Sequence, residues 1–127
     1  MSDKPIRVVL DTSAVVAFTR GSIHVGEVIA EIDDEDAAVG IPVLCMVEAT
    51  QAVADTDRLN LLDNHRASVL LDEEGAGWRA LAATYDIVGR IDAASAVLAA
   101  IDLDCMVLTG QPGLYGGLAD GGPVIPL

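Results

Sequence analysis

Basic residues are scarce in this chain of 127 residues, where seven Lys and Arg stand against 20 Asp and Glu. The resulting formal net charge is −13. Because an acidic surface repels phosphate, we do not expect tight nonspecific binding to duplex nucleic acid. Aromatic residues are also few, at 3% of the chain, which is too few for a base-stacking platform of the kind that single-strand-binding proteins use.

Long apolar runs are absent as well. The longest covers residues 41–47, whereas a membrane-spanning helix needs about 20 apolar residues. The opening MSDKPIRVVLD lacks the apolar stretch of a secretory signal peptide, and neither Cys45 nor Cys105 has a CxxC partner. We therefore expect a cytoplasmic protein that does not enter a membrane and whose cysteines are reduced core residues, although two thiols leave a disulfide open.

Apolar residues are plentiful, at 52% of the chain, which is enough for one sizeable hydrophobic core. Segments typical of strands and of helices alternate along the sequence. The expected strands cover residues 6–10, 37–41, 68–71, 106–109 and 124–126. The expected helices cover residues 14–18, 22–32, 42–53, 55–66, 78–85 and 91–101. This alternation predicts one α/β domain over residues 1–127, a three-layer α/β/α sandwich with a central parallel sheet.

Three acidic residues have positions that bear on function, because ligands of parallel sheets bind at the carboxyl ends of the strands. Asp11 directly follows the first expected strand, Glu48 lies within an apolar helix, and Asp92 begins an Ala-rich helix. Each also has an ordinary structural interpretation. Asp11 suits an N-cap, Glu48 suits the solvent edge of its helix, and Asp92 suits a cap or the first turn of a helix.

Taken together, the three carboxylates would point into one cleft at this edge of the sheet. Convergent carboxylates repel one another unless a cation neutralises them. A set of oxygen ligands without thiolate or imidazole suits Mg²⁺ or Mn²⁺ rather than Zn²⁺. The residues therefore favour a divalent-cation site, and the capping and solvent-edge interpretations stay open beside it.

At these residues the sequence resembles the PIN-domain family, above all its small toxin members of the VapC type. Four segments carry the resemblance, in this order: VVLDTSAVVAF (8–18), IPVLCMVEA (41–49), IDAASAVLAA (91–100) and MVLTGQPGLY (106–115). The resemblance implies a parallel sheet with helices on both sides, an acidic pocket that binds Mg²⁺ or Mn²⁺, and cleavage of RNA phosphodiester bonds. It also implies that Asp11 and Asp92 are metal ligands and that Glu48 completes the metal-binding and catalytic set.

The chain departs from the family pattern after the fourth expected strand. Family members commonly have T-x-D there, whereas this chain has Thr109, Gly110 and Gln111. Gln111 offers a carbonyl oxygen but no charge, so we expect a metal site held by three carboxylates to bind more weakly. We expect Thr109, Gln111 and Ser13 to be supporting polar residues of the pocket, and Asp120 is a candidate to replace the missing acid.

The partners follow from the same resemblance and from the charge. We expect RNA as substrate, with Arg90, Arg20 and Arg79 as the RNA-phosphate contacts and Arg90 the best placed of them. We also expect a homodimer and a basic, antitoxin-like protein partner that neutralises the acidic cleft. No nucleotide cofactor is expected, because the Gly-rich segment 113–122 does not follow the GxxxxGK[ST] pattern.

A second functional hypothesis belongs to another class. A PIN-fold module that has lost catalysis would act by binding a protein. The neutral side chain of Gln111 and the net charge of −13 are the two features that support it.

Overall fold

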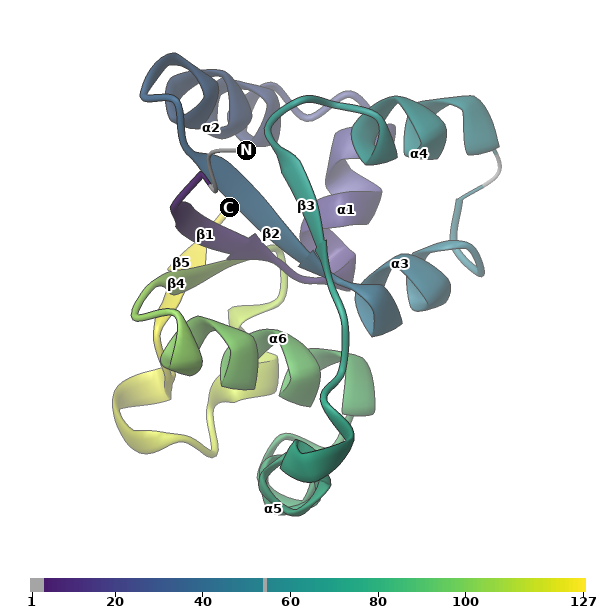
Figure 1. Cartoon of the computed structure of the whole chain (residues 1–127). Helices are drawn as coiled ribbons and strands as arrows, with labels where there is room; N and C mark the ends of the chain where they lie inside the picture. The colour runs from purple at the N-terminus through teal and green to yellow at the C-terminus, as the bar shows by residue number, and fades with distance from the viewer. Residues whose placement is uncertain (1–3, 54) are drawn as a thin grey trace.

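A five-stranded parallel sheet forms the centre of the protein (Figure 1). The computed structural model describes residues 4–53 and 55–127. The strands lie in the order β3-β2-β1-β4-β5, and every neighbouring pair is parallel. Their bounds are β1 (Ile6–Leu10), β2 (Ala38–Pro42), β3 (Ser68–Leu71), β4 (Met106–Thr109) and β5 (Val124–Pro126).

Helices cover both faces of this sheet, which gives the predicted three-layer α/β/α sandwich (Figure 1). One face carries α1, α2 and α4, and the other carries α6 with α5 outside it (Figure 1). The helices are α1 (Thr12–Thr19), α2 (Ile23–Asp34), α3 (Val43–Ala49), α4 (Thr56–Asp63), α5 (Trp78–Val88) and α6 (Ile91–Asp102). Short 3₁₀ turns are η1 (Gly75–Gly77), η2 (Pro112–Tyr115) and η3 (Ala119–Gly121).

The alternation of side chains along β1 explains how one strand supports two cores. Val8 and Leu10 belong to the buried cluster that contains α1, α2 and α4. Val9, between them, belongs to the cluster that contains α6 and Tyr115. Successive strand residues point to opposite faces, so a continuous apolar run in β1 fits a strand that is buried on both sides.

Most boundaries match the prediction, and the third helix is the clearest exception. It was expected over residues 42–53, but α3 ends at Ala49. After that residue the backbone tightens into i→i+3 hydrogen bonds, with Gln51 donating to Glu48 at 3.1 Å and Ala52 donating to Ala49 at 3.0 Å. The Thr50 hydroxyl donates to a carbonyl of the last turn at 2.6 Å, which competes with continuation of the helix.

Close packing in the sheet depends on a glycine in β2. A Cβ atom at Gly40 would lie 2.8 Å from Cδ1 of Leu71 and 3.1 Å from Cγ2 of Ile6. The strand is fully buried, so a larger side chain would have no open space to enter. A second glycine, Gly89, ends α5 with φ of +85°, a conformation that suits glycine at this position.

Two expectations from composition can be compared with the fold directly. Cys45 is buried and Cys105 is half-buried, and the two are not joined by a disulfide in the structure. None of the helices in the described part of the chain combines the length and the apolar character that a membrane span requires.

Candidate active site

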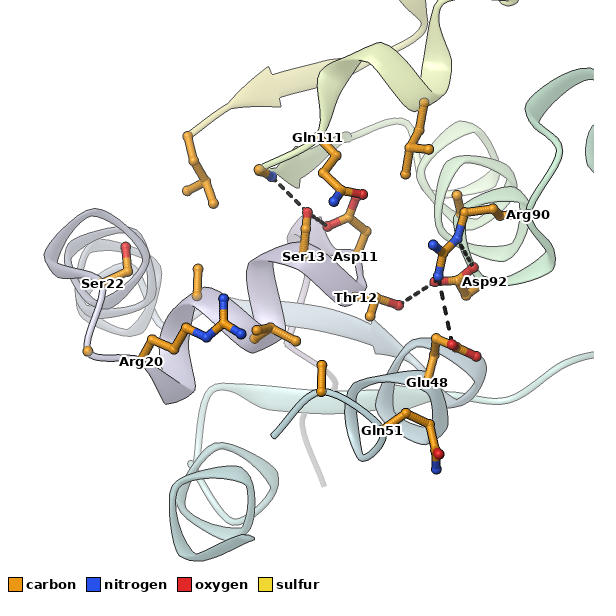
Figure 2. A pocket seen from close by; sticks show the side chains of 18 residues that line it. Asp11, Thr12, Ser13, Arg20, Ser22, Glu48, Gln51, Arg90, Asp92 and Gln111 are labelled. Atoms are coloured by element: carbon orange, nitrogen blue, oxygen red, sulfur yellow. Dashed lines mark hydrogen bonds and ion pairs between the residues drawn. The ribbon is translucent and has the colours of Figure 1, made fainter. Parts of the chain in front are cut away.

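A cleft of about 730 Å³ opens where β1 and β4 end, beside the first turns of α1 and α6 (Figure 2). Its lining includes the three predicted acids, Asp11, Glu48 and Asp92. Ser13 and Gln111 line it as well. The fold therefore brings together residues from four distant segments of the chain, at the sheet edge where the sequence placed them.

Asp11 is held rigidly at the start of α1. It is the N-cap of this helix, and its Oδ1 accepts a hydrogen bond from the backbone N–H of Ala14 at 3.1 Å and one from the Ser13 hydroxyl at 2.6 Å. The other oxygen, Oδ2, accepts from the Tyr115 hydroxyl at 2.7 Å. Asp11 is only 2% exposed, so the capping interpretation is correct and the carboxylate also lies in the wall of the cleft.

Tyr115 is a residue that the sequence analysis missed. It comes from η2 in the Gly-rich tail and is fully buried beneath the cleft. Burial and the nearby negative charge of Asp11 raise the pKa of Tyr115, so its hydroxyl keeps its proton and donates to Asp11. A buried Tyr hydroxyl usually finds a polar partner. Tyr115 and Asp11 are 104 residues apart in the chain, so no local pattern in the sequence indicated this pair.

Asp92 lies in the first turn of α6 and is 5% exposed. Its Oδ2 accepts from the Thr12 hydroxyl at 2.6 Å and from Arg90 Nη2 at 3.2 Å, and its Oδ1 accepts from Arg90 Nε at 3.1 Å. Burial raises the pKa of Asp92, but the hydrogen bonds from Arg90 and Thr12 and the Arg90 charge outweigh burial, so this pKa lies below the usual range. The first-turn interpretation holds, and the carboxylate is charged near neutral pH.

Glu48 is the exposed member of the set. Its side chain is 49% exposed, and its Oε1 lies 3.8 Å from Nη2 of Arg90. The solvent-edge interpretation is therefore correct for its helix, while the carboxylate still reaches the cleft (Figure 2). One guanidinium thus contacts both Glu48 and Asp92.

The chemistry of the donors suits the expected ion. Carboxylate, amide and hydroxyl oxygens are the ligands that Mg²⁺ and Mn²⁺ prefer, and the cleft offers all three kinds. Among the residues that the structure describes, however, no three acidic, His or Cys side chains are grouped so that they could hold one metal ion. The positive charge between Glu48 and Asp92 comes instead from Arg90.

The turn after β4 is fixed by hydroxyl groups. Thr109 is fully buried, and its Oγ1 accepts from the backbone N–H of Gln111 at 3.0 Å and lies 3.2 Å from the Ser13 hydroxyl. The Ser13 oxygen accepts from the backbone N–H of Gly110 at 2.8 Å. Thr109 and Ser13 therefore connect β4 to α1 and present the Gln111 side chain to the cleft.

Two predicted site residues lie elsewhere. Arg20 lines the cleft together with Arg90, but Arg79 is outside it, on α5, where its guanidinium stacks 4.4 Å from the centre of the Trp78 ring. Asp120 is also absent from the cleft lining and belongs to η3, with φ of +57°. Contact of Arg79 with RNA therefore stays a prediction for the surface outside this cleft, and Asp120, the candidate to replace the missing acid, does not line the cleft in this structure.

Comparisons with known proteins support the architecture. No family model matches the chain, and no curated protein matches it. The chain is similar to a solved structure, the crystal structure of PAE2754 from Pyrobaculum aerophilum, with a TM-score of 0.61 over 94% of this chain and 90% of that one. Sequence identity between the two is 16%. The likeness shows the fold alone.

Proposed function

We propose that the cleft is the active site of a Mg²⁺- or Mn²⁺-dependent endoribonuclease, the activity that the resemblance to VapC-type PIN domains implies. One observation carries the proposal. Asp11, Glu48 and Asp92, which are far apart in the sequence, line a single cleft at the carboxyl edge of a parallel sheet. This edge is where ligands of such sheets bind.

The three carboxylates differ in mobility, which assigns them different parts. Asp11 and Asp92 are buried and held by hydrogen bonds, so they provide fixed oxygen ligands. Glu48 is half-exposed, so it can adjust its position when a cation or an attacking water is present. When bound, Mg²⁺ or Mn²⁺ would neutralise charge on the phosphodiester and make water a better nucleophile at neutral pH.

The charged residues that line the cleft are of both signs. Two arginines, Arg20 and Arg90, line it together with three acidic residues, whereas the whole chain carries −13. The two guanidinium groups offset part of the repulsion that the three carboxylates exert on an RNA phosphate. We propose Arg20 and Arg90 as the groups that hold the substrate phosphates. The proposed reaction requires neither a membrane nor a nucleotide cofactor.

The remaining negative charge supports a protein partner. A basic, antitoxin-like protein would be attracted to this surface and could insert an Arg or Lys side chain between the cleft carboxylates. The expected homodimer stays a prediction. An enzyme of this kind would act on RNA in the cytoplasm, where its two free thiols would remain reduced.

A second candidate function is that of a catalytically impaired PIN-fold module that acts by protein–protein binding. The ion pairs of Arg90 with Glu48 and Asp92 favour it, since they neutralise two of the three acids without a metal. Gln111, at the position where the family commonly has an acid, favours it too. This module would hold its partner without cleaving RNA.

The experiment that tests the main proposal compares two Asp→Asn variants on a structured RNA with millimolar Mn²⁺. Asp92→Asn removes a charge from the cleft but keeps the shape of the side chain, so cleavage should be lost while the circular dichroism spectrum is unchanged. Asp86→Asn makes the same change on the exposed surface of α5 and should cleave like the wild type. Equal cleavage by both variants would exclude Asp92 as part of the active site, and loss of the native spectrum in Asp92→Asn would mean that the residue maintains the fold.

A further inference from the structure

Arg90 contacts two of the three acidic residues of the cleft, Asp92 and Glu48. Its Nε and Nη2 donate to the two oxygens of Asp92 at 3.1 and 3.2 Å, and Nη2 also lies 3.8 Å from Oε1 of Glu48. A forked guanidinium matches a carboxylate with two parallel hydrogen bonds. Figure 2 shows the guanidinium of Arg90 beside Asp92, with a dashed line from it to Glu48.

The backbone of Arg90 is fixed by hydrogen bonding, whereas its side chain is partly exposed to solvent. The carbonyl of Arg90 accepts the first hydrogen bond of α6 from Ala94 at 2.9 Å. The preceding Gly89 takes a left-handed conformation that ends α5. The Arg90 side chain itself is 44% exposed, so a change of rotamer moves the guanidinium into solvent without any change in the core.

Asp92 would not follow this movement. Its side chain is 7% exposed, and the Thr12 hydroxyl binds Oδ2 at 2.6 Å. Departure of Arg90 would therefore leave a buried, fixed carboxylate and the nearby Glu48 without their cation. Uncompensated charge of this kind is costly, so a replacement cation is favoured.

We propose that Arg90 is a built-in competitor of the divalent cation, and that the ion binds the cleft only when the guanidinium leaves Asp92 and Glu48. This inference rests on the proposed function, because it concerns the metal affinity of the same site. The substrate supplies a reason for Arg90 to leave, since a phosphodiester offers the guanidinium another anionic partner of suitable geometry. Arg90 thereby links phosphate binding to metal binding.

Arg20 provides a matched control for this role. It lines the same cleft, but within the described part of the chain the structure gives it no ion pair. Removing its charge therefore changes the general potential of the cleft without releasing a carboxylate. Arg90→Lys is a second control, because it keeps the charge but cannot form the forked pair.

The test is a calorimetric titration of MnCl₂ into the wild type, Arg90→Gln, Arg90→Lys and Arg20→Gln at constant ionic strength. Arg90→Gln should bind Mn²⁺ at least about tenfold more tightly than the wild type, because a like charge is removed a few ångströms from the ion. Arg20→Gln should change the affinity by less than about threefold, because its charge is more distant and exposed. Arg90→Lys should lie between the wild type and Arg90→Gln.

Thermal melts give a second readout, the gain in melting temperature on addition of Mn²⁺, which loss of a purely structural ion pair would not change. In EDTA, Arg90→Gln should melt below the wild type, and with millimolar Mn²⁺ it should gain more in melting temperature than the wild type gains. If Mn²⁺ binds the wild type and Arg90→Gln with equal affinity, Arg90 does not compete, although the metal site of the proposed function stands. If neither protein binds Mn²⁺, the metal-dependent function itself fails, and the competition with it.

Discussion

Tyr115→Phe isolates one hydrogen bond beneath the cleft. The Tyr115 hydroxyl donates to Oδ2 of Asp11 at 2.7 Å, and both residues are buried. Phenylalanine keeps the ring and its packing in the cluster that contains Val9, Val97 and Val107. The substitution therefore removes a donor to a charged, buried oxygen and changes little else.

The expected decrease in the free energy of unfolding depends on the hydrogen bonds that Asp11 keeps in Tyr115→Phe. The other oxygen keeps its hydrogen bonds from Ala14 and Ser13, so the carboxylate does not lose all its partners. Removing one donor from a buried charged group costs about 1–3 kcal/mol. Because Oδ2 has no other hydrogen bond from the described residues, we expect Tyr115→Phe to lower the free energy of unfolding by about 2 kcal/mol, in the middle of this range.

The assay is urea unfolding at neutral pH in EDTA, followed by circular dichroism. Tyr85→Phe is the control, since it removes the same hydroxyl from a side chain on α5 that is 44% exposed, and it should change the free energy of unfolding by less than about 0.5 kcal/mol. An equal, small effect of the two substitutions would refute the view that Tyr115 holds Asp11 in place.

Three further predictions concern the sheet, a thiol and the departure from the family pattern. Gly40→Ala should lower the free energy of unfolding by about 1 kcal/mol in the same urea titration, because the new Cβ would approach Leu71 at 2.8 Å. Gly26→Ala in α2 is the control: its Cβ meets nothing within 4 Å, so it should raise the free energy of unfolding by about 0.5–1 kcal/mol. Burial raises the pKa of Cys45 to about 12, so a thiol reagent should leave this thiol unmodified in the native protein at pH 8. The free energy of unfolding should fall as the pH rises from 9.0, the ordinary pKa of the thiol, toward 12, because only the unfolded chain loses the proton in this range. Cys45→Ala should reduce this fall. Gln111→Asp should lower the melting temperature in EDTA through added repulsion and tighten Mn²⁺ binding about tenfold, or ~1.4 kcal/mol, and unchanged values in both measurements would contradict its place in the cleft.

Local patterns were sufficient to predict the strands and the general position of the site. The strands at residues 6–10, 68–71, 106–109 and 124–126 have the predicted bounds, since short apolar runs between turn signals specify them within the segment itself. The position of Asp11 followed from the same local argument, because an acid directly after a central parallel strand lies at the carboxyl edge of the sheet.

Side-chain partners between distant segments could not be predicted in this way. Arg90 was expected to contact RNA, and the structure adds two partners that the sequence analysis did not name, Asp92 two residues on and Glu48 on another helix. Arg79 was grouped with it by charge alone, and only the packing of α5 places its guanidinium over Trp78. Contacts between charged groups depend on side-chain rotamers and on how the helices are placed. The periodicity of the sequence predicts neither of these.

The most direct test of the central claim is RNA cleavage by the wild-type protein as a function of Mn²⁺ concentration, from excess EDTA to several millimolar. The account predicts no cleavage in EDTA and a rate that rises with Mn²⁺ and saturates, because the cleft carboxylates need a cation to act on a phosphodiester. Cleavage that persists unchanged in EDTA, or no cleavage at any Mn²⁺ concentration, would contradict it.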